Sequence, residues 1–429
     1  MLSRRRFLGI SSAAMAGTAC QAGLPAQEQS GEDLPAPIAA LQHETHRATP
    51  ISVDERSGRV EKARRLMREN GMDGLMLTGG TSLMYYSGIR WGLSERLLSL
   101  VVPASGGAFV VCPAFEEERA REQLANGPFG ADTPVLVWEE DEDPYGLVAQ
   151  GLRDAGVSTG RLGVEETVRH VFSNGVAQAA PAIDLASGTP VTAGCRMVKD
   201  QHELDLMTLA SEITLKAYEA AYLSMEEGMT QRDFGRLVSL AHERQGTSGG
   251  ASVQTAEFSA LPHGSATPQV IREGTILLID GGCSVEGYRS DISRTFVLGQ
   301  ATQKMKDVFQ IELRAQTAAL EAAGPGVEAQ AVDAAARTVI EDAGYGPGYT
   351  YFTHRVGHGM GMDGHEWPYL VKGNTMALEP GMTFSDEPGI YIPGEFGIRL
   401  EDDMYITEDG AALMTAQSLS LEDPFNRMA

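Results

Sequence analysis

The stretch "LLIDGGCSVEGYRSDISRTF", residues 277–296, sets two carboxylates inside a segment with the pattern of a strand hairpin. Four apolar residues, 276–279, lead into Asp280, and Asp291 follows eleven residues later beside further strand-forming residues. If the two runs pair as antiparallel strands around "SVEG", Asp280 and Asp291 become cross-strand neighbours with Cβ atoms about 5 Å apart. Two carboxylates so close raise each other's pKa unless a cation lies between them. The stretch therefore predicts a hairpin that presents carboxylates to a metal ion.

The chain repeats this order of elements once more. Two helical segments of equal length, each bounded by glycines, are followed by a histidine in a glycine-rich stretch, then by a strand, and then by a carboxylate. In the first copy these are residues 228–246, His263 and Asp280, and in the second copy residues 326–344, His358 and Glu387. A serial match of this kind predicts an internal duplication, and two similar halves that face each other form a cleft.

A second hairpin, centred on Gly394, brings Glu387 and Glu401 together in the same way. The complete candidate ligand set is Asp280, Asp291, His358, Glu387 and Glu401. Four hard oxygen donors and one imidazole suit Mn²⁺ and, less selectively, Zn²⁺, Co²⁺ or Fe²⁺. Five ligands for two ions about 3.5–4 Å apart require bridging carboxylates and leave room for a bridging water, which the ions would acidify to a hydroxide nucleophile. The alternative, solvated turn carboxylates and a buried structural histidine, fits any single residue better than all five in this order.

Three motifs of the chain resemble the metal-site motifs of the pita-bread metallopeptidases, in the branch that contains aminopeptidase P and prolidase. They are residues 277–296, "HRVGHGMGMDGHEWP" at 354–368 and "SDEPGIYIPGEFGIRLEDD" at 385–403. The resemblance implies an α/β creatinase-like N-terminal domain over residues 49–195, where predicted helices and strands alternate. It also implies an α+β pita-bread catalytic domain over residues 196–429, with an internal pseudo-twofold duplication.

The same resemblance implies a role for each metal ligand. Asp280 would chelate one ion, and His358 and Glu387 would hold the other. Asp291 and Glu401 would bridge both ions. Glu387 would also act as the proton shuttle.

The resemblance further implies five active-site residues around the metal ions. His263 would contact the substrate, and His365 would polarise the scissile carbonyl and stabilise the oxyanion. His354 matches a further active-site histidine, Arg399 would pair with carboxylates of the metal site, and Tyr391 lies near it. Alternatively, His354, His365, Tyr391 and Arg399 only orient the groups that do the chemistry.

The resemblance implies a dinuclear-metal peptidase that hydrolyses the bond between an N-terminal residue and a following proline in small peptides. It leaves open an Xaa-Pro aminopeptidase or a dipeptidase, and it implies a homo-oligomer, dimer or tetramer. One alternative is non-peptidase chemistry on the same fold, by a metal-dependent lyase or a small C–N hydrolase. Another is a non-catalytic peptide-binding module. The intact ligand set disfavours a metal-free enzyme and the binding module.

The composition excludes two classes of partner. The chain of 429 residues carries 58 acidic and 34 basic residues, a net charge of −24, which repels nucleic-acid phosphates and anionic lipid surfaces. Cys112, Cys195 and Cys283 are widely spread, so we expect buried thiols and no disulfide framework.

The N-terminus predicts export. "SRRRFLGISSAAMAGTAC", residues 3–20, has the paired arginines and short apolar run of a twin-arginine signal, expected to span residues 1–26 and to direct the chain to the periplasm. The run is too short to form a stable membrane span. Lipid attachment at Cys20 is disfavoured because Gly17 stands where such sites usually carry leucine. Residues 27–48 are expected to form a linker.

Overall fold

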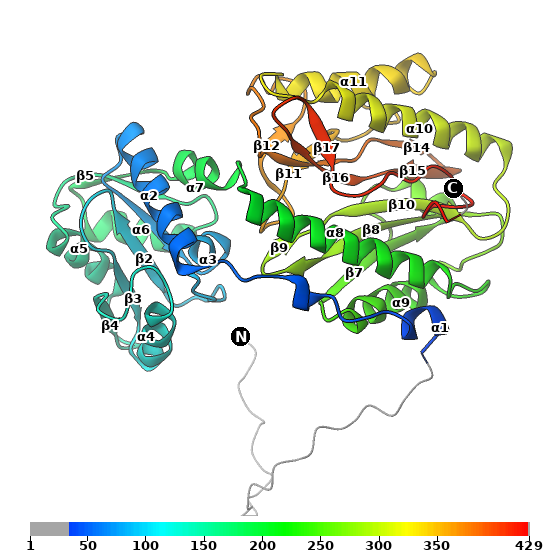
Figure 1. The fold of residues 1–429 in the computed structure, drawn as a ribbon. Coiled ribbons are helices and arrows are strands. Elements are labelled where there is room, and N and C mark those ends of the chain that lie inside the picture. The colour runs from blue at the N-terminus through cyan, green and yellow to red at the C-terminus, as the bar shows by residue number, and fades with distance from the viewer. Residues whose placement is uncertain (1–33, 428–429) are drawn as a thin grey trace, which may run out of the picture. The chain divides into compact units, whose positions relative to one another are not determined.

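The computed structural model describes residues 34–427. The predicted signal segment, residues 1–26 with Cys20, lies outside these residues. The fold described below belongs to the compact unit that begins at Ala36 (Figure 1). Within residues 34–427, no helix is both long enough and apolar enough to cross a membrane.

The described part of the predicted linker differs from a loose connection. It forms helix α1 (Ala36–Ala39) and the 3₁₀ turn η1 (Thr45–Arg47). Ile38 of α1 is fully buried among alanines of helices α8 (Gln201–Tyr222) and α9 (Gln231–Arg244). The segment is short and carries Pro35 and Pro37, so it shows no helical periodicity, and the sequence pattern did not predict this contact.

The N-terminal part of the described chain is an α/β layer built on a six-stranded mixed sheet with the order β4-β3-β2-β1-β5-β6. Apolar residues line both faces of the sheet, which helices cover (Figure 1). Strands β2 and β3 pair antiparallel and form a hairpin. The strands are β1 (Gly74–Thr78), β2 (Ser99–Pro103), β3 (Phe109–Pro113), β4 (Val135–Trp138), β5 (Gly160–Val164) and β6 (Ile183–Ser187). The helices are α2 (Val53–Glu69), α3 (Thr81–Ser87), α4 (Glu117–Ala125), α5 (Pro144–Asp154), α6 (His170–Ala179) and α7 (Thr189–Arg196), with the 3₁₀ turn η2 (Ala114–Glu116).

The C-terminal part opens with α8, and a capping box closes the N-terminus of this helix. The Asp200 side chain accepts a hydrogen bond from the backbone N–H of Glu203, and the Glu203 side chain accepts from that of Asp200. The duplicated helical segments form α9 and α11 (Ala329–Asp342), each of 14 residues, and α10 (Gln303–Ala322) precedes α11.

Two sheets carry the two halves of the duplication. The first has the order β10-β8-β7, with β9 paired to β8, and the second has the order β12-β11-β13-β16-β17, with β14 and β15 as a separate pair. Figure 1 shows α8 and α9 along the first sheet and α10 and α11 beside the second, and each half has its own apolar core. The strands are β7 (Gly249–Thr255), β8 (Ile276–Val285), β9 (Tyr288–Arg289), β10 (Ile292–Val297), β11 (Gly357–Gly359), β12 (Glu366–Leu370), β13 (Thr383–Asp386), β14 (Gly389–Ile392), β15 (Phe396–Arg399), β16 (Asp402–Ile406) and β17 (Ala411–Leu413), with the 3₁₀ turn η3 (Ala256–Ala260) after β7.

A histidine joins α8 to the start of α2. His202 Nδ1 lies 2.6 Å from Glu55 Oε1, and its Nε2 lies 2.9 Å from the carbonyl oxygen of Thr49. Two oxygen acceptors favour the doubly protonated ring. Burial lowers the pKa of His202, but these two acceptors outweigh it and raise the pKa above its usual value. Burial raises the pKa of Glu55, but hydrogen bonds from Ser52 and His202 bring it down to about 2.

This contact predicts a pH-dependent contribution to stability. Because the folded-state pKa of His202 is raised, its stabilisation is complete below the unfolded pKa of about 6.5 and is lost as the pH rises through the folded pKa. For this partly exposed pair we expect His202→Gln to lower the free energy of unfolding by about 0.5–1 kcal/mol at pH values near 5.5. Urea denaturation across pH should show this difference shrinking above neutrality. His170→Gln, on an exposed surface, is the matched control. A difference that grows with pH would contradict the assignment.

Candidate metal centre

The five candidate ligands lie on or beside strands of the two sheets, which are joined by a bridge between Ser293 and Glu401. Asp280 lies on β8, Asp291 follows β9, and His358 lies on β11. Glu387 lies directly after β13, and Glu401 lies between β15 and β16. His358 Nε2 is 3.2 Å from Glu387 Oε1 and 3.8 Å from Asp291 Oδ2.

The donor atoms of three of these ligands lie as close to one another as the ligands of a single metal ion. One donor atom from each of Asp291, His358 and Glu401 lies within 4.8 Å of the others. Asp280 and Glu387 stand beside this group: Asp280 forms an ion pair with Arg399 at 2.7 Å, and Glu387 Oε1 lies 3.2 Å from His358 Nε2. The structure thus brings all five predicted ligands to one place.

The predicted register of the first hairpin is wrong. Asp280 pairs with Ser293, and the turn is formed by Glu286 and Gly287, so Asp291 lies diagonally from Asp280 and not opposite it. Glu286 and Gly287 both adopt positive φ, 50° and 92°, the requirement of a two-residue hairpin turn. Glycine meets this requirement at no steric cost, which places the turn one residue later than symmetry about "SVEG" suggests. Diagonal neighbours on one face remain close enough for their charges to interact.

The second hairpin has the predicted centre at Gly394. The β14–β15 pair and the β13–β16 pair keep the same register, and Asp386 lies opposite Asp402 in the latter. Glu387 directly follows β13 and Glu401 directly precedes β16. Both residues therefore lie at the bend between the β13–β16 pair and the β14–β15 pair. The bend therefore turns both carboxylates out of the sheet and into the site.

The electrostatics of the ligands call for a cation. Burial and the charge of Asp280 raise the pKa of Asp291 to about 7. Burial and the charge of Asp291 raise the pKa of Glu401 well above its usual value. Burial raises the pKa of Glu387 too, but its hydrogen bond with His358 brings it down to about 2. A divalent cation would let these buried carboxylates ionise together.

The orientation of His358 also fits a metal ligand. Its Nδ1 lies 3.1 Å from the carbonyl oxygen of Gly359, which can only accept a hydrogen bond. The Nδ1 position therefore carries a proton, which leaves Nε2, on the side of the carboxylates, as the nitrogen that would bind a metal ion. A backbone carbonyl that fixes the tautomer in this way is the usual support of a metal-binding imidazole. The donor set and its tautomer fit a site for hard divalent ions.

Arg399 is buried and links several side chains of the site through hydrogen bonds. Its guanidinium donates to Asp280 and to the hydroxyl of Ser293 at 2.9 Å, and that hydroxyl donates to Glu401 Oε2 at 2.5 Å. Ser293 was not predicted from the sequence, because a serine on a strand carries no distinct signal. Arg399 also donates to the hydroxyl of Tyr391 at 3.1 Å. The resemblance-based roles of Arg399 and Tyr391 are compatible with these contacts.

His354 is linked to Arg399 through the hydroxyl of Tyr391. Its Nδ1 is 2.8 Å from the carbonyl oxygen of Arg355, so Nδ1 donates and Nε2 accepts from the Tyr391 hydroxyl at 2.7 Å. Burial lowers the pKa of His354, which keeps the ring neutral. His354 therefore orients Tyr391 and, through it, Arg399.

His365 lies on the open side of the centre. Its exposed ring stacks on His358, with centroids 3.8 Å apart and an angle of 18° between planes. Burial and the charge of His358 lower its pKa. A neutral imidazole can donate a hydrogen bond to a substrate oxygen bound beside His358.

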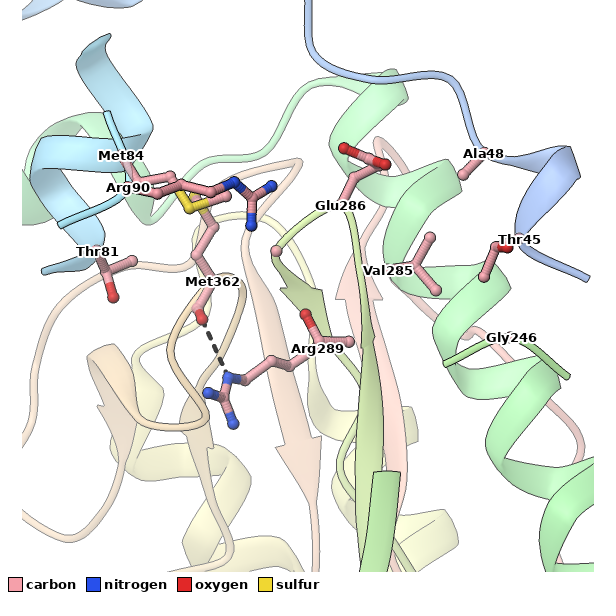
Figure 2. A pocket seen from close by; sticks show the side chains of 12 residues that line it. Thr45, Ala48, Thr81, Met84, Arg90, Gly246, Val285, Glu286, Arg289 and Met362 are labelled. Atoms are coloured by element: carbon pink, nitrogen blue, oxygen red, sulfur yellow. Dashed lines mark hydrogen bonds between the residues drawn. The ribbon is translucent and has the colours of Figure 1, made fainter. Parts of the chain in front are cut away.

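Three cationic side chains hold the loop that carries His365. The buried Arg196 forms ion pairs with Asp363, at 2.6 Å, and with Glu366, and Lys199 lies 3.3 Å from Glu366. Burial raises the pKa of Glu366, but Lys199 and Arg196 bring it down to about 2. Figure 2 shows the third contact, in which Arg289 Nε donates to the carbonyl oxygen of Met362 at 3.1 Å. These contacts fix the loop on both sides of His365.

His263 is less closely tied to the site. Its side chain is exposed, and the adjacent Pro262 carbonyl accepts a hydrogen bond from Arg399 at 3.1 Å. The charge of His263 contributes to lowering the pKa of His354 and His365, after burial as the largest cause for both. His263 thus lies at the rim of the candidate centre.

A cavity of about 510 Å³ lies near the turn of the first hairpin (Figure 2). Its walls include Arg90, Glu286, Arg289 and Met362. None of the five candidate ligands lines it. The cavity is therefore separate from the metal centre.

Comparisons with known proteins agree with this geometry. The profile of metallopeptidase family M24 matches residues 205–408, and that of the creatinase/prolidase N-terminal domain matches residues 59–198. The chain is 37% identical over 344 residues to "Probable dipeptidase PepE" of Mycobacterium tuberculosis, covering 80% of this chain and 89% of the relative. It is 33% identical over 371 residues to the Xaa-Pro dipeptidase of Lactobacillus delbrueckii subsp. lactis, covering 85% and 98%.

Solved structures show the same similarity in three dimensions. The dipeptidase PepE of Mycobacterium ulcerans has a TM-score of 0.80 and 33% identity, covering 87% of this chain and 99% of that one. The prolidase of Pyrococcus furiosus has a TM-score of 0.70 and 30% identity, covering 83% and 100%. These likenesses support the predicted creatinase-like and pita-bread folds.

Proposed function

The chain belongs to metallopeptidase family M24, with a creatinase/prolidase N-terminal domain, and we propose that it hydrolyses the bond between an N-terminal residue and a following proline in small peptides. The observation that carries this proposal is the convergence of Asp291, His358 and Glu401 within chelating distance, beside Asp280 and Glu387. The preference for proline is supported by relatives named Xaa-Pro dipeptidase.

We further propose that the centre takes two divalent ions, with Mn²⁺ as the first candidate. The residues that would hold them are Asp280, Asp291, His358, Glu387 and Glu401. When bound, the ions would polarise the scissile carbonyl and activate a water for attack on it. Of the described residues, only His358 adds a nitrogen ligand to this set, which suits Mn²⁺ better than a softer ion.

The protein's own side chains have distinct tasks in this proposal. Glu387, with its lowered pKa, is the carboxylate that can take a proton from the attacking water and pass it to the leaving nitrogen. His365 donates a hydrogen bond to the carbonyl oxygen as negative charge develops there. Arg399, oriented by Tyr391 and His354, holds the Asp280 carboxylate in place.

Export by the twin-arginine pathway to the periplasm is also part of the proposal. It is supported by Arg4 and Arg5 ahead of the short apolar run. A homo-oligomeric state, dimer or tetramer, is proposed on the resemblance alone. Neither changes the chemistry expected at the centre.

The proposal is tested by product analysis. Mn²⁺-loaded protein is mixed with an Xaa-Pro dipeptide and with a longer peptide that has proline second, and products are identified by mass spectrometry. Release of the N-terminal residue from either peptide is expected, and matched peptides with alanine second should be cleaved more slowly. Protein stripped of metal by a chelator is the negative control. If metal-loaded protein cleaves no proline peptide, the activity is of another class, such as a lyase.

A further inference from the structure

Two arginines line the cavity near the turn of the first hairpin without an acidic partner (Figure 2). Among residues 34–427, neither Arg90 nor Arg289 forms an ion pair with a carboxylate. The backbone N–H of Arg90 donates to Gln123 Oε1, and Arg289 Nε donates to the carbonyl oxygen of Met362. The chain carries 58 acidic and 34 basic residues. Because carboxylates are in such excess, two unpaired guanidinium groups in one cavity make a local positive site.

A third arginine adds positive charge beside this cavity. Arg56 Nη1 donates at 2.7 Å to the carbonyl oxygen of Met84, which is one of the lining residues. Arg56 is half-buried, and in the described part of the chain it has no carboxylate partner. Burial lowers the pKa of Arg56 most, and the charges of Arg59 and Arg90 lower it further. Like charges held close together are stabilised by an anion placed near them.

The cavity also presents one carboxylate. Glu286 is half-buried in the hairpin turn, and no cationic side chain of residues 34–427 forms an ion pair with it. Figure 2 shows Arg90 reaching from the segment after α3, whereas Glu286 and Arg289 project from the hairpin. An inorganic anion would be repelled by Glu286, and an apolar ligand would leave all three charges unpaired. The lining therefore matches a molecule with two negative groups and one positive group.

The size and the apolar wall of the cavity suit a small organic molecule. Its volume of about 510 Å³ lies within the range of ordinary small-molecule sites. Met84 and Met362 both pack on the hairpin turn, where a Cβ at Gly287 would approach their methyl groups to 2.8 Å and 3.2 Å. Methionine side chains are flexible and polarisable, so this wall can adjust to the carbon chain of a ligand.

We propose that this cavity is a binding site for a free acidic amino acid. The two carboxylates of the ligand pair with Arg90 and Arg289, and its ammonium group pairs with Glu286. A planar guanidinium pairs with a carboxylate through two parallel hydrogen bonds, which gives the site its specificity. The binding needs neither a metal ion nor the peptidase reaction.

A ligand in this cavity contacts the segments that hold the loop carrying His365. Arg289 Nε donates to the carbonyl oxygen of Met362 at 3.1 Å, three residues before His365. On the opposite wall, the hydroxyl of Thr81 donates to Asp363 Oδ1 at 2.5 Å. Occupancy should therefore tie α3, the hairpin turn and this loop together and slow their local opening.

The test is isothermal titration calorimetry of the metal-loaded protein with three probes. They are L-glutamate, glutarate, which has the same two carboxylates but no ammonium group, and inorganic phosphate. L-Glutamate should bind tightest, by roughly 10-fold or more over glutarate, the size of one charge-assisted hydrogen bond. Arg90→Met should weaken L-glutamate binding by roughly 10- to 100-fold, and Arg90→Lys should weaken it less. Glu286→Gln should abolish the preference for L-glutamate over glutarate.

Hydrogen exchange measured by mass spectrometry locates the bound probe. L-Glutamate should slow amide exchange in residues 284–289 and also in residues 81–90, which contain no candidate metal ligand. Exchange unchanged in residues 81–90 would overturn the inference, because the probe would then lie elsewhere, for example on the metal ions. This measurement needs no variant.

Controls separate recognition from folding. Arg314→Met, on the exposed face of α10, should keep the wild-type affinity for L-glutamate. Metal content and circular dichroism are compared for every variant. No binding of L-glutamate at millimolar concentration would overturn the inference, and so would equal affinity for L-glutamate and glutarate. Wild-type affinity in a folded Arg90→Met protein would overturn it as well.

Discussion

Asp291→Asn is expected to abolish both metal binding and peptidase activity. One oxygen of the Asp291 carboxylate lies within 4.8 Å of donor atoms from His358 and Glu401. An amide has nearly the same shape, but it carries no charge and has one fewer oxygen donor. Because bound ions contribute several kcal/mol to transition-state stabilisation, we expect kcat/KM to fall on the order of 10³-fold or more.

This prediction is checked by counting metal and by assay. Metal content by inductively coupled plasma mass spectrometry should fall below that of the wild type after identical loading and dialysis. Asp409→Asn, in the exposed turn between β16 and β17, is the matched control and should retain metal and activity. A fully loaded and active Asp291→Asn protein would eliminate Asp291 as a ligand.

Arg294→Met is expected to destabilise the fold more than any surface substitution. Arg294 is fully buried, and its guanidinium lies 2.6 Å from Asp402 Oδ1. Asp402 lies directly opposite Asp386, whose carboxylate has no hydrogen-bond partner among the described residues. Without Arg294, two buried carboxylates would face each other with no cation. Removing one partner of a buried ion pair typically costs about 3–5 kcal/mol of unfolding free energy.

Urea denaturation measures this cost directly. Adding Asp402→Asn to Arg294→Met should recover part of the loss, because the unpaired charge is then removed. The exposed pair Arg161 and Asp184 provides the control: Arg161→Met should cost less than about 1 kcal/mol. If Arg294→Met lowers the free energy of unfolding by less than about 1 kcal/mol, the buried Arg294–Asp402 pair does not stabilise the fold as proposed.

The predictions from sequence that were confirmed rest on local signals. The flanking glycines bound the two helical segments that form α9 and α11, which have equal lengths. The hairpin at Gly394 was placed correctly because its turn centre coincides with the centre of symmetry of the motif. Such signals depend on residues close together in the chain.

The features that were missed depend on competing or distant interactions. The first hairpin turned at Glu286 and Gly287 because backbone conformation outweighed the symmetry of the carboxylates. The contact of Ser293 with Glu401 joins residues more than a hundred positions apart. Local patterns carry no information on such pairs, and only the assembled sheets show them.

The most direct test of the account is the position of bound metal in crystals of Mn²⁺-loaded protein. An anomalous difference map recorded near the manganese absorption edge should show two peaks within the space bounded by Asp280, Asp291, His358, Glu387 and Glu401. Loaded crystals with no peak at these five side chains, or with manganese held only at other residues, would contradict the assignment of this site as the catalytic metal centre.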